Sequence, residues 1–89
     1  MARVRFTANL QRHVLLPPTD VVGATVREVL ESAFSNNPVG RGYVLDDHGA
    51  LRKHMIIFVD AEAIHDRDGL TDPVRPHSEI HVMQALSGG

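Results

Sequence analysis

The sequence predicts an α+β domain in which one main helix packs on one face of a mixed β-sheet. Three observations favour this class: alternating apolar and polar residues at the start, one helical apolar repeat after residue 25, and two extended segments in the second half. A chain of 89 residues suits a single domain. We expect the folded domain at residues 1–85 and a flexible tail at 86–89.

The N-terminal segment predicts a hairpin. Val4, Phe6 and Ala8 alternate with polar residues, which is typical of a strand with one buried face. Residues 13–16 are extended again and stop at two prolines. Two short extended runs around the polar residues 9–12 indicate two paired strands.

The helix has clear start and stop signals. Thr25 followed by Glu28 three positions later is the capping-box pattern. Pro38 ends the helix, because proline disfavours helical geometry at the residue before it. Between them, five apolar residues recur with helical spacing and form one face: Val26, Val29, Leu30, Ala33 and Phe34.

The remaining chain predicts a long connection followed by strands. Residues 39–53 form the connection, with an extended piece at 43–45 and a partner strand at 51–52. Residues 55–59 are a continuous apolar run rich in β-branched residues, which indicates a buried strand. Two further extended segments complete the pattern, a brief one at 62–64 and an alternating one at 79–86.

Composition excludes several classes of function. The net charge of −2 argues against a nucleic-acid-binding face, which would be basic. The absence of cysteine excludes disulfides and thiolate chemistry and fits a reducing compartment. No apolar run approaches the ~20 residues of a membrane span, and the N-terminus does not resemble a signal peptide. We therefore expect a cytoplasmic protein with no nucleic-acid or membrane partner.

The tail Leu86-Ser87-Gly88-Gly89 is the strongest functional signal. Two glycines lack Cβ atoms, so they can pass through a narrow channel and present the Gly89 carboxylate to a buried active site. A terminus that frays, or residues added for expression, would leave the same sequence without a function. The tail gains meaning only together with the fold.

The segments before the tail resemble a known family. They are listed from the N-terminus: Val4-Arg5-Phe6, Thr25-Val26-Arg27-Glu28-Val29-Leu30, Asp47-His48-Gly49-Ala50-Leu51-Arg52, Ile57-Phe58-Val59-Asp60, Gly69-Leu70-Thr71-Asp72-Pro73-Val74 and Glu79-Ile80-His81-Val82. With Gly88-Gly89, they resemble the ubiquitin-like β-grasp sulfur carriers of the ThiS and MoaD family, which includes the small subunit of molybdopterin synthase. The resemblance covers nearly the whole chain.

The resemblance implies a carrier protein and not an enzyme. An adenylating enzyme of the ubiquitin-activating type would use ATP and Mg²⁺ to activate the Gly89 carboxylate. A sulfur donor would then form a C-terminal thiocarboxylate, and a biosynthetic enzyme would accept the sulfur. This chain would bind no cofactor itself, and it has no glycine-rich phosphate loop. Molybdopterin, cysteine and thiamine biosynthesis all stay open as pathways.

Two turns depart from the family pattern. Asp60-Ala61 stands where members often have Asn-Gly after the middle strand, and His77-Ser78 stands where they often have Gly-Asp before the last strand. Both turns are expected to lie away from the tail. They weaken the assignment to any one pathway.

The strand alternation also predicts a docking face. Ile56, Phe58 and Met83 should lie on the sheet face opposite the helix, where apolar residues suggest a partner surface. The full set of expected partner-binding residues is Met83, Phe58, Ile56, Leu86, Ser87, His81 and Arg5, with His54 also at the rim. Alternatively, residues 43–51 cover Ile56 and Phe58.

Other chemistries are less well supported. His77, Glu79 and His81 do not follow the zinc-enzyme order, so we expect no metal site. The aspartates lie at turn signals, where such side chains bind their own backbone, and we expect no hydrolase. Arg41, Arg52, Lys53 and Arg67 are expected to form a solvated surface. A protein modifier attached through Gly89 to lysines, or a β-grasp module with an inert tail, are the alternative functions.

Overall fold

A computed structural model describes residues 1–7, 10 and 16–84. The described elements follow the chain in this order: β1 (Ala2–Phe6), β2 (Thr19–Val21), α2 (Val26–Ala33), α3 (Pro38–Val44), β3 (Met55–Val59), β4 (Glu62–Ala63) and β5 (Glu79–Gln84). The strands form one five-stranded sheet in the order β2-β1-β5-β3-β4. The central pair β1–β5 is parallel and the other pairs are antiparallel. The expected α+β architecture with a mixed sheet is confirmed.

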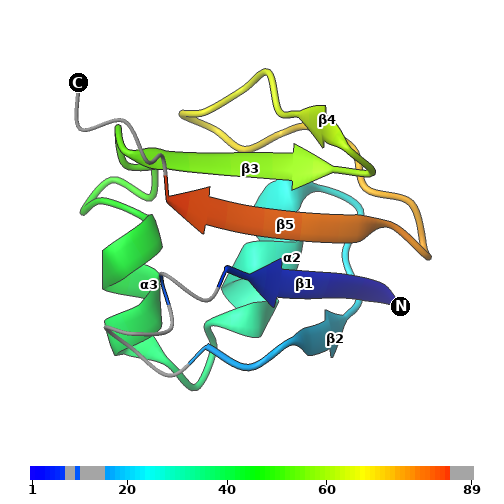
Figure 1. Cartoon of the computed structure of the whole chain (residues 1–89), viewed down its shortest axis with the longest axis horizontal. Coiled ribbons are helices and arrows are strands. Elements are labelled where there is room, and N and C mark those ends of the chain that lie inside the picture. The colour runs from blue at the N-terminus through cyan, green and yellow to red at the C-terminus, as the bar shows by residue number, and fades with distance from the viewer. Residues whose placement is uncertain (8–9, 11–15, 85–89) are drawn as a thin grey trace.

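The helix α2 covers one face of this sheet, and Figure 1 shows it passing behind β1 and β5. Thr25 caps it, because its side chain accepts a hydrogen bond from the Glu28 backbone N–H at 3.3 Å. Glu28 in turn accepts from the Ala24 N–H at 3.0 Å, which completes a variant of the expected capping box. Val26, Val29 and Leu30 are buried against the sheet.

A strand that the sequence did not predict lies at Thr19–Val21, after the prolines, and pairs with β1. Most of the strand expected at residues 13–16 falls outside the described residues, so it stays a prediction. Residues 13–15 lie outside the described part of the chain, and Leu16 is buried without belonging to a strand. Proline has no N–H to donate to a ladder, which fits the start of this strand directly after Pro18. β2 then pairs antiparallel with β1, with Val4 opposite Thr19 and Ala2 opposite Val21.

A second helix replaces the extended piece expected at 43–45. α3 begins because Asn37 caps it, accepting a hydrogen bond from the Gly40 N–H at 2.9 Å, and because Pro38 suits the first helical turn. The Asn-Pro pair therefore starts the second helix, whereas α2 has already ended at Ala33 with Phe34 as its C-cap. Two glycines in seven residues weaken the helical sequence signal. The expected partner at 51–52 is confirmed in part by a bridge between Leu45 and Leu51.

The last three strands lie where the sequence predicts them. β3 pairs with β5 over its whole length, from Met55 opposite Gln84 to Val59 opposite Ile80. Asp60 and Ala61 link β3 to β4 with φ values of 50° and 72°, the left-handed geometry of a tight hairpin. β5 ends at Gln84 among the described residues.

The core lies between the sheet and α2. It is built of side chains from the inner faces of the strands, from both helices and from the loops, including Val4, Phe6, Val29, Leu30, Val44, Leu45, Leu51, Ile57, Leu70, Ile80 and Val82. No helix in residues 1–7, 10 and 16–84 is long and apolar enough to cross a membrane.

Candidate docking face and C-terminal tail

The sheet face opposite α2 carries the residues expected to bind partners. Strand register brings them into rows across the sheet. Ile56 lies directly opposite Met83. Phe58 lies opposite His81, which in turn neighbours Arg5 on the parallel strand β1. These five residues come from three strands that are far apart in the sequence.

The apolar part of this face lies on β3 and β5. Ile56, Phe58 and Met83 are half-buried, whereas their neighbours in the strands, Ile57 and Val82, are fully buried on the opposite side. The connection expected as a possible cover packs elsewhere, because Val44, Leu45 and Leu51 belong to the core cluster that contains Ile57 and Val82. Figure 1 shows that neither α2 nor α3 crosses the near side of β3 and β5.

The charged part lies on β1 and β2. The Arg3 guanidinium donates two hydrogen bonds to Asp20, at 2.8 and 3.0 Å. These bonds hold the pKa of the Asp20 carboxyl below its ordinary value of 3.8. Arg5 lies 3.4 Å from the Glu79 carboxylate. The open face therefore changes from ion pairs at β2, β1 and the start of β5 to apolar side chains at Met83 of β5 and at Ile56 and Phe58 of β3.

The two turns that depart from the family pattern are joined in the structure. Asp60 accepts hydrogen bonds from the Ser78 hydroxyl at 2.8 Å and from the Glu79 N–H at 3.0 Å. Both bonds lower the pKa of Asp60, the backbone one most. Ser78 is 2% exposed, and its hydroxyl also accepts from the Arg75 N–H at 2.9 Å. We call these hydrogen bonds of Asp60 and Ser78 the clasp. They hold the start of β5 against the end of β3.

Other loop aspartates bind backbone, as the sequence predicts. Asp66 accepts from the Gly69 N–H at 2.9 Å and from the Thr71 hydroxyl at 2.6 Å. Asp72 accepts from the N–H groups of His65 and Asp66. Among the described residues there is no group of three or more His, Cys, Asp or Glu side chains that could hold a metal ion.

The expectation that Arg41, Arg52, Lys53 and Arg67 form a solvated surface is wrong for Arg41 and Arg67, whose guanidinium groups bind other parts of the chain, whereas Lys53 is exposed. Arg41 makes a bidentate pair with Glu31, both bonds at 2.9 Å, and so ties α3 to α2. Arg67 donates to the Arg52 carbonyl at 2.8 Å. Arg27, which the sequence did not single out, donates to the carbonyls of Gly49, Asp68 and Gly69. These bonds between guanidinium groups and loop carbonyls join residues at no fixed sequence spacing, so the sequence alone does not predict them.

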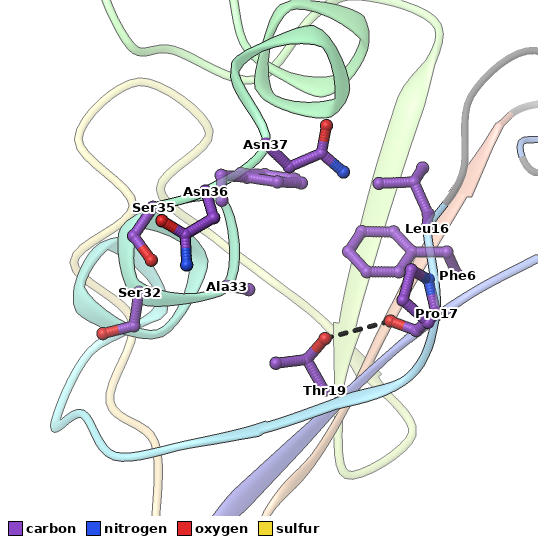
Figure 2. Close-up of a pocket in the computed structure, with 10 residues that line it drawn as sticks. Phe6, Leu16, Pro17, Thr19, Ser32, Ala33, Ser35, Asn36 and Asn37 are labelled. Atoms are coloured by element: carbon purple, nitrogen blue, oxygen red, sulfur yellow. Dashed lines mark hydrogen bonds between the residues drawn. The ribbon is translucent and has the colours of Figure 1, made fainter.

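A hollow of about 480 Å³ lies away from the open face, between the end of α2 and the segment that leads into β2. Figure 2 shows Leu16, Pro17 and Thr19 on one side of it and Ser32, Ala33 and Asn36 on the other. None of Ile56, Phe58 and Met83 lines it. The hollow does not belong to the expected docking face.

The tail residues Leu86, Ser87, Gly88 and Gly89 lie outside the described residues, so their roles stay predictions. Gln84, the last described residue, pairs with Met55 at the start of β3. Gln84 therefore lies at the end of the sheet that also carries the Ile56–Met83 pair.

Comparison with solved structures identifies the fold. The chain is similar to SAMP1 from Haloferax volcanii, with 24% identity, a TM-score of 0.75, and 99% of this chain and 98% of that chain covered. It is similar to a chain of the Amycolatopsis orientalis BexX/CysO complex, with 20% identity, a TM-score of 0.82, and both chains fully covered at 100%. It is also similar to the small archaeal modifier protein 1 of Methanosarcina acetivorans, with 22% identity, a TM-score of 0.80, and 99% and 95% covered.

No protein-family model matches the sequence, and no match was found among curated proteins. The structural likeness nevertheless extends over the whole chain. The fold is therefore the ubiquitin-like β-grasp, as the resemblance in the sequence implied.

Proposed function

We propose that this chain is a ubiquitin-like sulfur carrier that works through a thiocarboxylate at Gly89. The observation that supports it most is the β-grasp likeness over the full chain, combined with Gly88-Gly89 a few residues after β5. One of the similar structures, the BexX/CysO complex, contains such a fold bound to a second protein. The proposal takes Gly89 as the C-terminal residue of the working protein.

The chemistry needs only the carboxylate from this chain. A carboxylate oxygen of Gly89 attacks the α-phosphorus of ATP, and pyrophosphate leaves. Hydrosulfide then attacks the acyl carbon, AMP leaves with its bonding electron pair, and a proton is released. The product is a thiocarboxylate that a third protein uses as its sulfur source. ATP and Mg²⁺ are bound by the activating partner, and this chain supplies no catalytic group.

The sheet supplies the docking surface in this proposal. An apolar patch of Ile56, Phe58 and Met83 would pack against a hydrophobic area of the partner, while Arg5 and His81 at its border would fix the orientation. Burying such side chains is the main source of affinity at protein interfaces, and polar groups at the rim add specificity. Leu86 and Ser87 would enter the partner with the glycines.

Adenylation by a ubiquitin-activating-type enzyme of the same organism is the direct test. With the wild-type chain, we expect ATP–pyrophosphate exchange, and intact-mass analysis after adding sulfide should show one oxygen replaced by sulfur. Deletion of Gly89 should abolish both signals while leaving the unfolding curve unchanged. The proposal is overturned if the wild-type chain supports no ATP–pyrophosphate exchange and carries no added sulfur either in this assay or when it is isolated from its host.

The docking surface has its own measurement within this assay. Met83→Asp should raise the KM of the activating enzyme for this chain, because a carboxylate would have to be buried in an apolar contact. Val22→Asp is the matched control, since Val22 is 71% exposed and lies next to Val21, which pairs with Ala2 at the far end of the strands. Equal KM values for the two variants would contradict the assigned face.

A second function is favoured by the likeness to small archaeal modifier protein 1. In that case an amine of a protein lysine, and not sulfide, attacks the activated Gly89 carbonyl and forms an isopeptide bond. Isolation of the chain from its host would then yield a ladder of larger covalent adducts whose linkage peptides carry Gly88-Gly89 on lysine. The same mass analysis separates the two functions.

A further inference from the structure

The helix α3 exposes an apolar surface that the docking face does not include. Val39 is 61% exposed and Tyr43 is 38% exposed, and the two residues lie one helical turn apart. The other side of α3 buries Gly40 and Val44. A shallow groove of about 420 Å³ runs along this exposed side, lined by Pro38, Val39, Gly42, Tyr43, Arg52 and His54.

Hydrogen bonds place this α3 groove at the end of the sheet where Gln84, the last described residue, lies. Arg52 Nε donates to the Gly42 carbonyl at 2.7 Å, and the Arg52 N–H donates to the Val44 carbonyl at 3.1 Å. The Met55 N–H donates to the Arg52 carbonyl at 3.0 Å, and Met55 pairs with Gln84. Figure 1 shows α3 beside the arrowhead of β5.

The border of the groove is basic although the whole chain is acidic, with a net charge of −2. Arg52, Lys53 and His54 form no ion pair with any carboxylate of the described residues. Four other arginines do pair with carboxylates, namely Arg3, Arg5, Arg27 and Arg41. Asp46 lies close enough to Arg52 for an electrostatic interaction, and its carboxylate accepts hydrogen bonds from the backbone N–H groups of His48 and Ala50.

The short length of the tail limits how far the enzyme that binds Gly89 can lie from this groove. Five residues follow Gln84 in the sequence, and an extended chain spans at most about 3.3–3.6 Å per residue, so a segment of this length can reach no farther than roughly 18 Å from Gln84. An enzyme whose active site receives Gly89 must therefore approach the end of β5 closely. The α3 groove borders that end, next to the Ile56–Met83 pair of the docking face.

We infer that the α3 groove is a second contact surface for the enzyme that activates Gly89. It takes an apolar side chain of that enzyme, flanked by carboxylates that pair with Arg52, Lys53 and His54. This inference rests on the proposed function. It adds a second contact surface to the sheet face. It also predicts that the partner presents an apolar side chain with carboxylates on either side of it.

Gly42→Gln tests the surface without weakening the fold. A Cβ at Gly42 meets no atom within 4 Å, so the side chain enters open space and fills the groove. Glutamine is also a better helix former than glycine, so the variant should unfold at higher denaturant concentration than the wild type. We expect the KM of the activating enzyme for this chain to rise roughly tenfold, about 1.4 kcal/mol, with kcat unchanged. Val22→Asp, at the far end of the strands, should leave KM unchanged.

Lys53→Glu tests the charge of the partner. We expect it to raise KM and to make KM depend less on ionic strength. Salt screens the attraction between Lys53 and the carboxylates of the partner, and the variant no longer has this attraction. Wild-type KM values for Gly42→Gln and Lys53→Glu overturn this inference alone. Equal increases for these variants and Val22→Asp also overturn it. Absence of exchange with the wild-type chain overturns the proposed function, and this inference with it.

Discussion

Single residues carry the two unusual turns that border β3 and β5. Asp60 and Ala61 both have positive φ values, which an aspartate tolerates better than an alanine does. The turn nevertheless keeps the short two-residue form of a tight hairpin between β3 and β4. Ser78, the other departure from the family pattern, is bonded to this same Asp60. The two departures therefore belong to one hydrogen-bonded turn region. Each of them can be tested by a separate substitution.

Ala61→Gly should stabilise the protein. The left-handed geometry at Ala61, with φ at 72°, costs alanine about 1–2 kcal/mol, while glycine loses about 0.5–1 kcal/mol through its more flexible unfolded chain. We expect the free energy of unfolding in urea to rise by roughly 0.5–1 kcal/mol. Ala63→Gly in the extended strand β4 is the matched control and should lower it. A lower value for Ala61→Gly would contradict this account of the turn.

Ser78→Ala should destabilise the protein by about 1–2 kcal/mol, because the Arg75 N–H then loses its hydroxyl acceptor and Asp60 loses one donor. Urea unfolding at neutral pH measures the difference. The control is Ser32→Ala, an exposed serine in α2, where alanine suits the helix and stability should not fall. If both variants unfold alike, the clasp contributes nothing to stability.

At the scale of elements, α3 shows how two glycines in one helix have opposite roles. A Cβ at Gly40 would lie 2.7 Å from Leu16 Cδ2 and 2.8 Å from Asn37 Nδ2, so this glycine permits close packing of the helix start. Gly42 faces open space. The same helix therefore needs one glycine for its contact with the core and gains nothing in stability from the other.

Gly40→Ala should lower the free energy of unfolding by about 1–3 kcal/mol, the usual cost of overpacking a filled site. Gly42→Ala should raise it by about 0.5–1 kcal/mol, because alanine has the higher helix propensity. Chemical denaturation of both variants beside the wild type gives the comparison. Shifts of the same sign would show that the packing of α3 against Leu16 and Asn37 is not as described.

The whole molecule is stabilised by aspartates that accept backbone hydrogen bonds at its loops. The Ala50 N–H lowers the pKa of Asp46, and the His65 N–H lowers that of Asp72. The Thr71 hydroxyl likewise lowers the pKa of Asp66. These carboxylates hold the loops that enclose the core between the sheet and α2. Their ionisation therefore couples the stability of the whole fold to pH.

This coupling predicts acid sensitivity. The folded pKa values lie below the ordinary aspartate value of 3.8, so the unfolded chain binds more protons. The stabilisation is complete above that value and is lost as the pH falls through the folded values. Urea midpoints measured over a descending pH series should fall in this range, and Asp66→Asn should make the fall shallower. A midpoint that stays constant over the same series would contradict the prediction.

The sequence by itself determined β1, α2, β3, β4 and β5, because period-two alternation at Val4 and Phe6 and the capping box at Thr25 are local signals. It did not determine β2 or α3. It also supplied the Gly88-Gly89 tail. It placed Ile56, Phe58 and Met83 on one face of the sheet, because the alternation along a strand determines which side chains share a face. The tail itself lies outside the described residues, so its role still depends on the proposed experiments.

Only the tertiary structure decided what depends on contacts between distant residues. Strand pairing put Arg5, His81 and Phe58 in one row, although they come from three strands. The arginine bonds to loop carbonyls and the basic groove beside the end of β5 also join residues that are far apart in the sequence. Local patterns cannot report them, because their geometry exists only after the chain has folded.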